Sequence, residues 1–400
     1  MRSPSAARQK TLKTLVAIAA TLLIVSAGAD VPLQEGAPRR SLKPLNWSQH
    51  VYDFGNTGFQ QMYRMPIHRF YELLDGKPAE AGVKQFKGIR TYLTTKLTKN
   101  HYWRAYKGRT VPCEIRLAAT LRWLAGGQWQ DLRTAYGCSK AELFRTFWVV
   151  IDAINHELDN IHFPIDDLEG LQKLEANFRK NSRNQIWTGQ VGALDGCVIS
   201  TVSPGAEVDA PKLWYCARKC TYAILLQAIA DADRRFLWYD LDSLPTSHDS
   251  SAFMKSELGQ RIENHDLPEQ FHLSGDNAYR NGPSLVTPGL GARYSDFNFE
   301  HSSNRMPIEQ AFGELFARWG IFWRPLRMLH GRRALVTACC LRLHNWCVDN
   351  RIKLAYDEVN GMVQDTKGEW VLAVRFDRDG RPVDFLDTTG SQAPVLDTRV

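Results

Sequence analysis

The sequence lacks the dense cysteine spacing of a disulfide-stabilised secreted domain. Its eight cysteines are scattered through 400 residues, mostly in apolar runs. Disulfide frameworks belong to oxidising compartments, so we expect buried reduced thiols and an intracellular protein. Four metal-ligating side chains share one helical pattern near the end, and their apolar neighbours favour core packing over a zinc site: Cys339, Cys340, His344 and Cys347. No internal repeat is apparent either, so a repeat architecture is not expected.

A long apolar run is also missing. The longest candidate, Leu15–Ala27, is short and rich in alanine, which disfavours a membrane span. Residues 2–13 before it carry four basic side chains and no acid, and Ala27-Gly28-Ala29 follows the run. This is the description of a secretory signal, in conflict with the intracellular expectation. Residues 1–29 are therefore a signal-like or basic apolar segment, and the membrane is a partner only if this segment is retained as an anchor.

Acidic residues are scarce in the first part of the chain. Residues 1–150 contain 23 Lys+Arg against 9 Asp+Glu, whereas residues 151–400 contain 27 against 34. The overall composition, 44% hydrophobic and 23% charged, is that of an ordinary globular protein with roughly two to three domains. A basic N-terminal part and an acidic C-terminal part are typical of a nucleic-acid-binding module joined to a catalytic domain that contains carboxylates.

The pattern before residue 160 is helical. Residues 30–60 are rich in turn-forming residues and predict a linker, and residues 61–160 predict an all-α domain. Ser139 and Glu142 have the spacing of a capping box that begins the third helix of a helix-turn-helix-like unit. That helix would present Lys140 and Arg145 to DNA. A plain helical bundle without DNA contact is the alternative.

From about residue 185 the pattern changes to short strands. The order of elements predicts an α/β domain over residues 185–350, a ribonuclease-H-like mixed sheet with flanking helices, and a C-terminal extension over residues 351–400. The expected strands are Trp187–Val202, Tyr222–Asp231, Arg235–Leu241 and Phe271–Ser274, and the expected helices are Ser247–Ile262, Ile308–Phe322 and Ala334–Asn350.

Three acids stand in unusual settings in this domain. Asp195 lies in an apolar run, Asp276 ends a short strand, and Glu309 follows Pro307 in the expected first turn of a helix. Each alone has a plain explanation: a strand-end residue, an Asx turn, and a helix cap. Together in one pocket they would repel one another and attract a cation, and Mg²⁺ prefers such oxygen ligands together with phosphate.

The chain resembles the transposases of the PIF/Harbinger superfamily, a group of DDE endonucleases, from about Arg116 to Asn350. The motifs that carry the resemblance are Leu194-Asp195-Gly196, Arg218-Lys219, Ser247-His248-Asp249-Ser250, Gly275-Asp276-Asn277-Ala278-Tyr279, Arg305 to Gly313, and Leu343-His344-Asn345. The resemblance implies that Asp195, Asp276 and Glu309 are the catalytic and metal-binding D, D and E, with Mg²⁺ or Mn²⁺ as cofactor. It also implies a Myb-like accessory protein. Phe316 and the segment Leu244–Ser247 depart from the family pattern.

The expected function is a metal-dependent DNA endonuclease or transposase that cuts phosphodiester bonds with two metal ions. In this hypothesis Asp195 bridges both ions, while Asp276 and Glu309 hold one each. His248 and Asp249 would support the site or, more simply, cap a helix. The alternative function is a domesticated DNA-binding protein that no longer cuts, and a homo-oligomer is also considered. The expected location is the nucleus, or outside the cell if residues 1–29 are a working signal.

Overall fold

The structure is a computed structural model, in which the described residues from Pro44 onward fold together. Beyond residue 353 and at residues 97–99, only the backbone is described. The expected N-terminal segment 1–29 and most of the extension 351–400 lie outside the described residues. The described ranges are 43–77, 86–99, 111–182, 185, 187–205 and 208–353, with the short strands 362–364, 370–372, 375–376 and 382–383.

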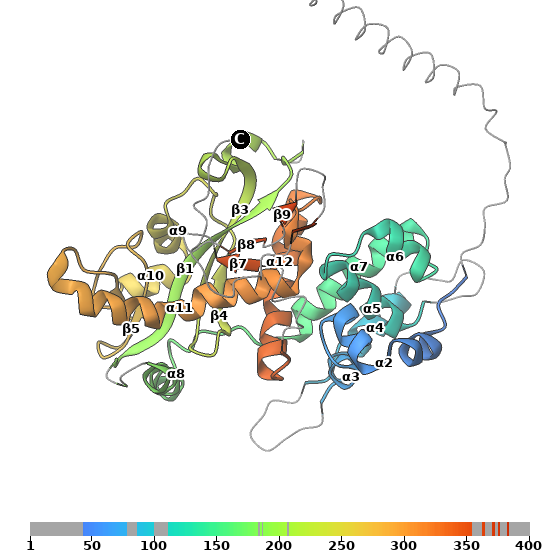
Figure 1. The fold of residues 1–400 in the computed structure, drawn as a ribbon, viewed down its shortest axis with the longest axis horizontal. Helices are drawn as coiled ribbons and strands as arrows, with labels where there is room; N and C mark the ends of the chain where they lie inside the picture. The colour runs from blue at the N-terminus through green and yellow to red at the C-terminus, as the bar shows by residue number, and fades with distance from the viewer. Residues whose placement is uncertain are drawn as a thin grey trace, which may run out of the picture. The chain divides into compact units, whose positions relative to one another are not determined.

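The front of the described chain is helical (Figure 1). Its first helix, α2, covers residues that the sequence predicts as a linker, because Asn46 caps its start and Phe59 and Tyr63 are completely buried near its end. Gly55 inside α2 has φ 56° and interrupts the regular helix. The helices are α2 (Trp47–Tyr63), α3 (Ile67–Asp75), α4 (Arg90–Lys99), α5 (Cys113–Leu124), α6 (Trp129–Ala135) and α7 (Lys140–Glu157).

The start of α7 follows the expected capping pattern only in part. Ser139 is the N-cap, and its hydroxyl accepts a hydrogen bond from the Glu142 backbone N–H at 3.2 Å. The Glu142 carboxylate pairs with the buried Arg116 of α5 at 2.7 Å. Helices α5 and α7 also meet through stacked rings of Trp123 and Phe147, 4.4 Å apart. The Ser139 cap is therefore present, whereas the role of α7 toward DNA stays a prediction.

A mixed sheet forms the centre of the second part. Strand β1 (Gln190–Thr201) pairs antiparallel with β3 and parallel with β5. The strand order is β4-β3-β1-β5-β6, with β2 also on β3, which is consistent with the ribonuclease-H-like arrangement. The remaining strands are β2 (Tyr215–Cys216), β3 (Thr221–Ala230), β4 (Phe236–Asp240), β5 (His272–Ser274) and β6 (Leu285–Val286).

Helices cover both faces of this sheet (Figure 1). Because side chains alternate along a strand, Ala193 joins the core shared with α11 and α12, while Leu194 joins a second core. Phe253 of α9 belongs to that second core. The helices are α8 (Leu168–Asn181), α9 (Asp249–Lys255), α10 (Glu257–Glu263), α11 (Ser295–Arg318) and α12 (His330–Asp349).

Two helices differ from the sequence-based expectation. The expected helix Ser247–Ile262 is divided at Ser256, whose hydroxyl caps α10 by accepting from the Gly259 N–H at 3.1 Å. Helix α11 begins at Ser295 rather than at Pro307, so Pro307 lies inside it. The missing proline N–H is tolerated because neighbouring residues such as Ile308 are completely buried against the sheet.

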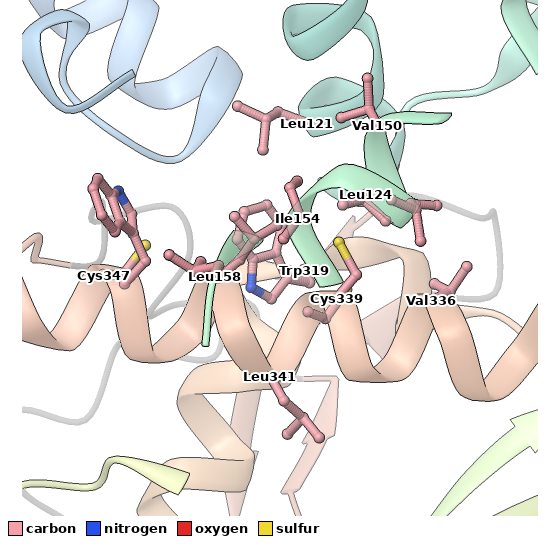
Figure 2. Close-up of a cluster of buried hydrophobic side chains, with 14 of the residues drawn as sticks. Leu121, Leu124, Val150, Ile154, Leu158, Trp319, Val336, Cys339, Leu341 and Cys347 are labelled. Atoms are coloured by element: carbon pink, nitrogen blue, oxygen red, sulfur yellow. The ribbon is translucent and has the colours of Figure 1, made fainter. Parts of the chain in front are cut away.

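One hydrophobic core continues from the front helices into the sheet part. Figure 2 shows Ile154 and Leu158, from the end of α7, beside Cys339 of α12 and the completely buried Trp319. The Asn155 side chain of α7 also donates to the Leu335 carbonyl at 3.0 Å. The regions expected as separate domains, 61–160 and 185–350, are thus packed on each other through apolar side chains.

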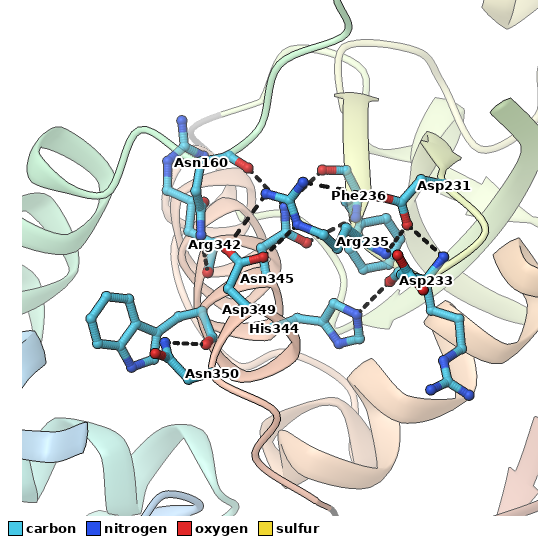
Figure 3. Close-up of polar contacts among 12 residues, drawn as sticks. Asn160, Asp231, Asp233, Arg235, Phe236, Arg342, His344, Asn345, Asp349 and Asn350 are labelled. Carbon is cyan, nitrogen blue, oxygen red and sulfur yellow. Dashed lines mark hydrogen bonds and ion pairs between the residues drawn. The ribbon is translucent and has the colours of Figure 1, made fainter. Parts of the chain in front are cut away.

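Helix α12 is tied to the turn between β3 and β4 (Figure 3). Asn345 accepts from the Phe236 N–H at 2.8 Å and donates to the Phe236 carbonyl at 2.7 Å. His344 donates to the Arg234 carbonyl at 2.8 Å, and burial lowers its pKa to about 3, so it is neutral. Its cysteine neighbours on α12 are buried in the core, and burial raises the thiol pKa of Cys339 and Cys340.

Candidate active site

Asp195 lies on β1, and Asp276 lies two residues past the end of β5, the parallel neighbour of β1. Ala193 of β1 is the register partner of Ser274, the last residue of β5. Asp195 and Asp276 each lie two residues further along, so both carboxylates project beside the point where β5 ends. Asp276 also accepts a hydrogen bond from the Ala278 N–H at 2.9 Å. The Asx turn considered for Asp276 is therefore present, and it fixes the carboxylate next to Asp195.

Glu309 reaches this place from the middle of α11. The helix starts at Ser295, so the helix-cap explanation for Glu309 was wrong. Arg305, one turn earlier, forms an ion pair with Glu309 and places another guanidinium nitrogen 3.4 Å from Asp195 Oδ2. Their side chains are largely shielded, with 17% of Arg305, 22% of Asp195 and 26% of Glu309 exposed. The cation found among these acids is a protein side chain.

The charges of the other two acids act on Asp195. Burial raises the pKa of Asp195 to about 7, Arg305 opposes this rise, and the negative charges of Asp276 and Glu309 add to it. Three carboxylates brought into one shielded place disfavour full ionisation of the most buried one. The acids predicted from the sequence therefore share one electrostatic neighbourhood.

The carboxylate oxygens of these acids are suitable ligands for a divalent ion, but their arrangement in this structure does not form a metal site. Hard oxygen ligands are what Mg²⁺ and Mn²⁺ prefer. However, among the residues that the structure describes, no group of three histidine, cysteine, aspartate or glutamate side chains is arranged to hold a metal ion. Arg305 pairs with two of the three acids instead. An ion bound by all three would require Arg305 to move.

A fourth acid, expected from the sequence to support the site or to cap a helix, lies beside the triad. Asp249, at the start of α9, accepts from Gln227 Nε2 at 2.8 Å, and Gln227 accepts from the Tyr279 hydroxyl at 2.6 Å. Burial raises the Asp249 pKa, as does the charge of Asp276. A β-carbon on Gly196 would lie 2.5 Å from Asp249 Oδ1, which explains the glycine after Asp195. The signal in the sequence was the motif Ser247-His248-Asp249-Ser250.

The other sequence-predicted residues have simpler surroundings. His248 occupies the N-cap position of α9, but its side chain makes no capping hydrogen bond. Lys140 and Arg145 are exposed on α7, and the Lys140 ammonium lies 4.8 Å from the centre of the Trp129 ring. Phe316, where the family pattern favours lysine, is half-buried on α11 and packs against Phe322 with ring centres 5.2 Å apart.

The mixed sheet with flanking helices is consistent with a ribonuclease-H-like nuclease, and acids from β1, the end of β5 and α11 lie near one another in it. Residues 194–345 match the family described as DDE superfamily endonuclease, which supports a DDE endonuclease domain over this stretch. The match includes Asp195, Asp276 and Glu309. No curated protein and no solved structure matches the chain.

No helix in the described part of the chain combines the length and the apolar character needed to cross a membrane.

Proposed function

We propose that this protein is a transposase-type DNA endonuclease of the PIF/Harbinger kind. The observation that carries the proposal is the meeting of Asp195, Asp276 and Glu309 around one buried strand position, inside the stretch that matches the DDE superfamily endonuclease family. Acids that share a shielded site are suited to a divalent cation and a phosphate chain. The substrate in this proposal is DNA, and the reaction is cleavage of a phosphodiester bond.

Asp195, Asp276 and Glu309 would hold Mg²⁺ or Mn²⁺ in this proposal, and such an ion supplies charge stabilisation and an activated oxygen nucleophile. The chain's own part is to position these carboxylates. Asp276 is held by its Asx turn, and Asp195 by the pairing of β1 with β3, where it lies opposite Ala228. Arg305 must withdraw from Glu309 and Asp195 before an ion takes its place.

The front helices have a separate role in the proposal. Helices α5 to α7 would bind DNA as a helix-turn-helix-like unit, with Lys140 and Arg145 exposed for phosphate contact. A Myb-like accessory protein, self-association into a homo-oligomer, and a nuclear location belong to the same proposal. Fusing residues 1–29 to a reporter and following its destination tests the location, because export of the reporter would contradict it.

The test is nicking of supercoiled plasmid DNA by the full chain in Mg²⁺ or Mn²⁺. We expect nicking in the wild type and its loss, by at least ~100-fold, in Asp195→Asn, Asp276→Asn and Glu309→Gln. The matched control is Glu169→Gln on α8, where the carboxylate is 75% exposed. This variant should cut DNA as the wild type does. Undiminished nicking by any triad variant would remove that residue from the assignment.

A second function, a domesticated DNA-binding protein that no longer cuts, is favoured by one observation. Arg305 neutralises two of the three acids, and the described residues hold no group of three metal-ligating side chains. Binding of Mn²⁺, followed by electron paramagnetic resonance without DNA, separates the two. A cutting enzyme should bind Mn²⁺ and lose it in Glu309→Gln, whereas the domesticated protein should bind none.

A further inference from the structure

Two segments of the endonuclease domain contain no acid. Residues 211–220 carry three Lys or Arg, and residues 324–333 carry four, although residues 151–400 have 34 Asp+Glu against 27 Lys+Arg overall. The negative total of this part of the chain therefore hides two local concentrations of positive charge. Positive charge collected on one face is the electrostatic signature of a nucleic-acid contact.

Strand pairing brings these two segments together at one end of the sheet. Tyr215 pairs with Tyr222, Tyr222 pairs with Thr201, and Thr201 forms a parallel bridge with Leu326. The Leu326 N–H donates to the Ser200 carbonyl at 2.9 Å. Neighbouring strands lie about 4.8 Å apart, so the four chain segments span about 15 Å. Both acid-free segments therefore lie at the same end of the sheet.

A ring contact confirms this closeness outside the sheet. The Trp214 ring lies edge-on to His330 with ring centres 4.0 Å apart, which joins the first segment to the start of α12. The basic side chains point outward, and those exposed to solvent are Lys212, Arg218, Lys219, Arg324 and Arg327. We call these five residues the sheet-end basic surface.

An open hollow of about 460 Å³ borders this surface at Arg327. Arg327 and the buried Arg333 line it, together with residues that follow β1. Arg333 is held in place because its guanidinium donates to Thr201 Oγ1 at 3.1 Å and to the Val202 carbonyl at 3.0 Å. A fixed guanidinium beside an exposed one is suited to an anionic oxygen, such as that of a phosphate.

The sheet-end basic surface and the acids lie at different positions along β1. From Asp195 to Thr201 the strand advances six residues, or about 20 Å at ~3.3 Å per residue. The charge of Arg218 opposes the rise that burial causes in the pKa of Asp249. A distance of about 20 Å along duplex DNA corresponds to about six base pairs at ~3.4 Å per base pair. The acids and the surface are thus spaced for two points on one duplex.

We propose that the sheet-end basic surface holds the DNA phosphate backbone about six base pairs from the bond that the acids address. The inference rests on the proposed DNA substrate, and it adds a contact within the endonuclease domain to the one proposed for the front helices. Lysine and arginine side chains position the backbone without selecting a base sequence. The surface therefore fixes where the duplex lies and leaves sequence selection to other parts of the protein.

The test is DNA binding by the full chain carrying Asp195→Asn, so that no cleavage intervenes. A labelled 30-base-pair duplex is titrated by fluorescence anisotropy at several salt concentrations in EDTA. The variant is Arg324→Glu with Arg327→Glu. The matched control is Lys173→Glu with Lys180→Glu on α8. This helix packs on β1 at the other end of the sheet, where Asn177 donates a hydrogen bond to Asp233 in the turn after β3. Thermal melting establishes that all variants are folded.

We expect the Arg324 and Arg327 variant to bind at least about tenfold more weakly, with the slope of log affinity against log salt reduced by about two. The control should stay within about twofold of the parent. Equal affinity in variant and parent, or weaker binding with an unchanged salt slope, would contradict the proposed DNA contact at the sheet-end basic surface. If the wild type nicks DNA while this variant binds normally, only this inference fails. If the wild type never nicks DNA but the variant loses DNA binding, the endonuclease proposal fails, and the proposed DNA contact at the sheet-end basic surface is supported.

Discussion

Arg305 lies one helical turn before Glu309, pairs with it, and reaches to 3.4 Å from Asp195. A guanidinium therefore takes the position in which the proposed function requires a divalent ion. Removing one partner from a shielded ion pair leaves a charge that needs another counter-ion. The two cations should compete for the same carboxylates.

The first prediction concerns this competition. Arg305→Gln should bind Mn²⁺ about tenfold more tightly than the wild type, equivalent to ~1.4 kcal/mol, because no guanidinium has to be displaced. Isothermal titration calorimetry without DNA measures the change. Arg261→Gln is the matched control, since Arg261 pairs with Asp166 and Asp266 away from the acids. Equal or weaker Mn²⁺ binding in Arg305→Gln would show that Arg305 does not compete with the ion.

The second prediction concerns pH. Burial raises the pKa of Asp195 from 3.8 to about 7, so the folded protein binds this proton more tightly than the unfolded chain does. The contribution of Asp195 to stability therefore falls as pH rises from about 4 to about 7. Asp195→Asn should remove this loss and raise the free energy of unfolding above pH 7 by up to about 4 kcal/mol, at ~1.4 kcal/mol per pKa unit.

Urea unfolding in EDTA at pH 5 and pH 8 measures this effect. The gain from Asp195→Asn should be larger at pH 8 than at pH 5, while the exposed control Asp209→Asn should change little at either pH. A gain that is the same at both pH values would mean that Asp195 keeps its ordinary pKa in the folded protein.

The third prediction concerns Gly196. Gly196→Ala would place a methyl group 2.5 Å from Asp249 Oδ1 and 2.6 Å from Gln227 Nε2, so it should separate this hydrogen-bonded pair. We expect a loss of about 1–3 kcal/mol in the free energy of unfolding, as in other overpacked sites. Chemical denaturation measures it. Gly282→Ala is the control, because no atom lies within 4 Å of its β-carbon position. Equal effects of the two substitutions would contradict the close approach of Asp249.

The fourth prediction concerns Asn345, which is completely buried. Its side chain makes hydrogen bonds with the Phe236 N–H, the Phe236 carbonyl and the Asn160 carbonyl. Asn345→Ala should leave these groups unsatisfied and cost roughly 3 kcal/mol, since each buried unsatisfied group costs ~1–3 kcal/mol. Thermal melting of the variant, beside Asn56→Ala on the exposed side of α2, checks the value. A melting temperature unchanged by Asn345→Ala would mean that α12 is held by its apolar contacts alone.

Local patterns in the sequence predict the strands well. The expected strand Tyr222–Asp231 is found as Thr221–Ala230, and Arg235–Leu241 as Phe236–Asp240, because β-branched and aromatic residues bounded by turn residues report strand structure directly. The cap at Ser139 was also read correctly, since its hydrogen bond joins residues three apart. Asp195 and Asp276 could be identified as candidates from the sequence because burying a carboxylate among apolar residues costs free energy.

Contacts between distant residues were decided only by the tertiary structure. Pro307 predicts a helix start by local rules, yet α11 passes through it because its flanking turns are buried against the sheet. The Arg305 contact with Asp195 and the approach of Asp249 to Gly196 depend on β1, α9 and α11 packing together. The sheet-end basic surface depends on the bridge between Thr201 and Leu326, 125 residues apart. Sequence alone thus determined the main strands, the Ser139 cap and the candidate acids, whereas long-range packing decided the start of α11 and which charges face those acids, because electrostatic partners depend on distance in space.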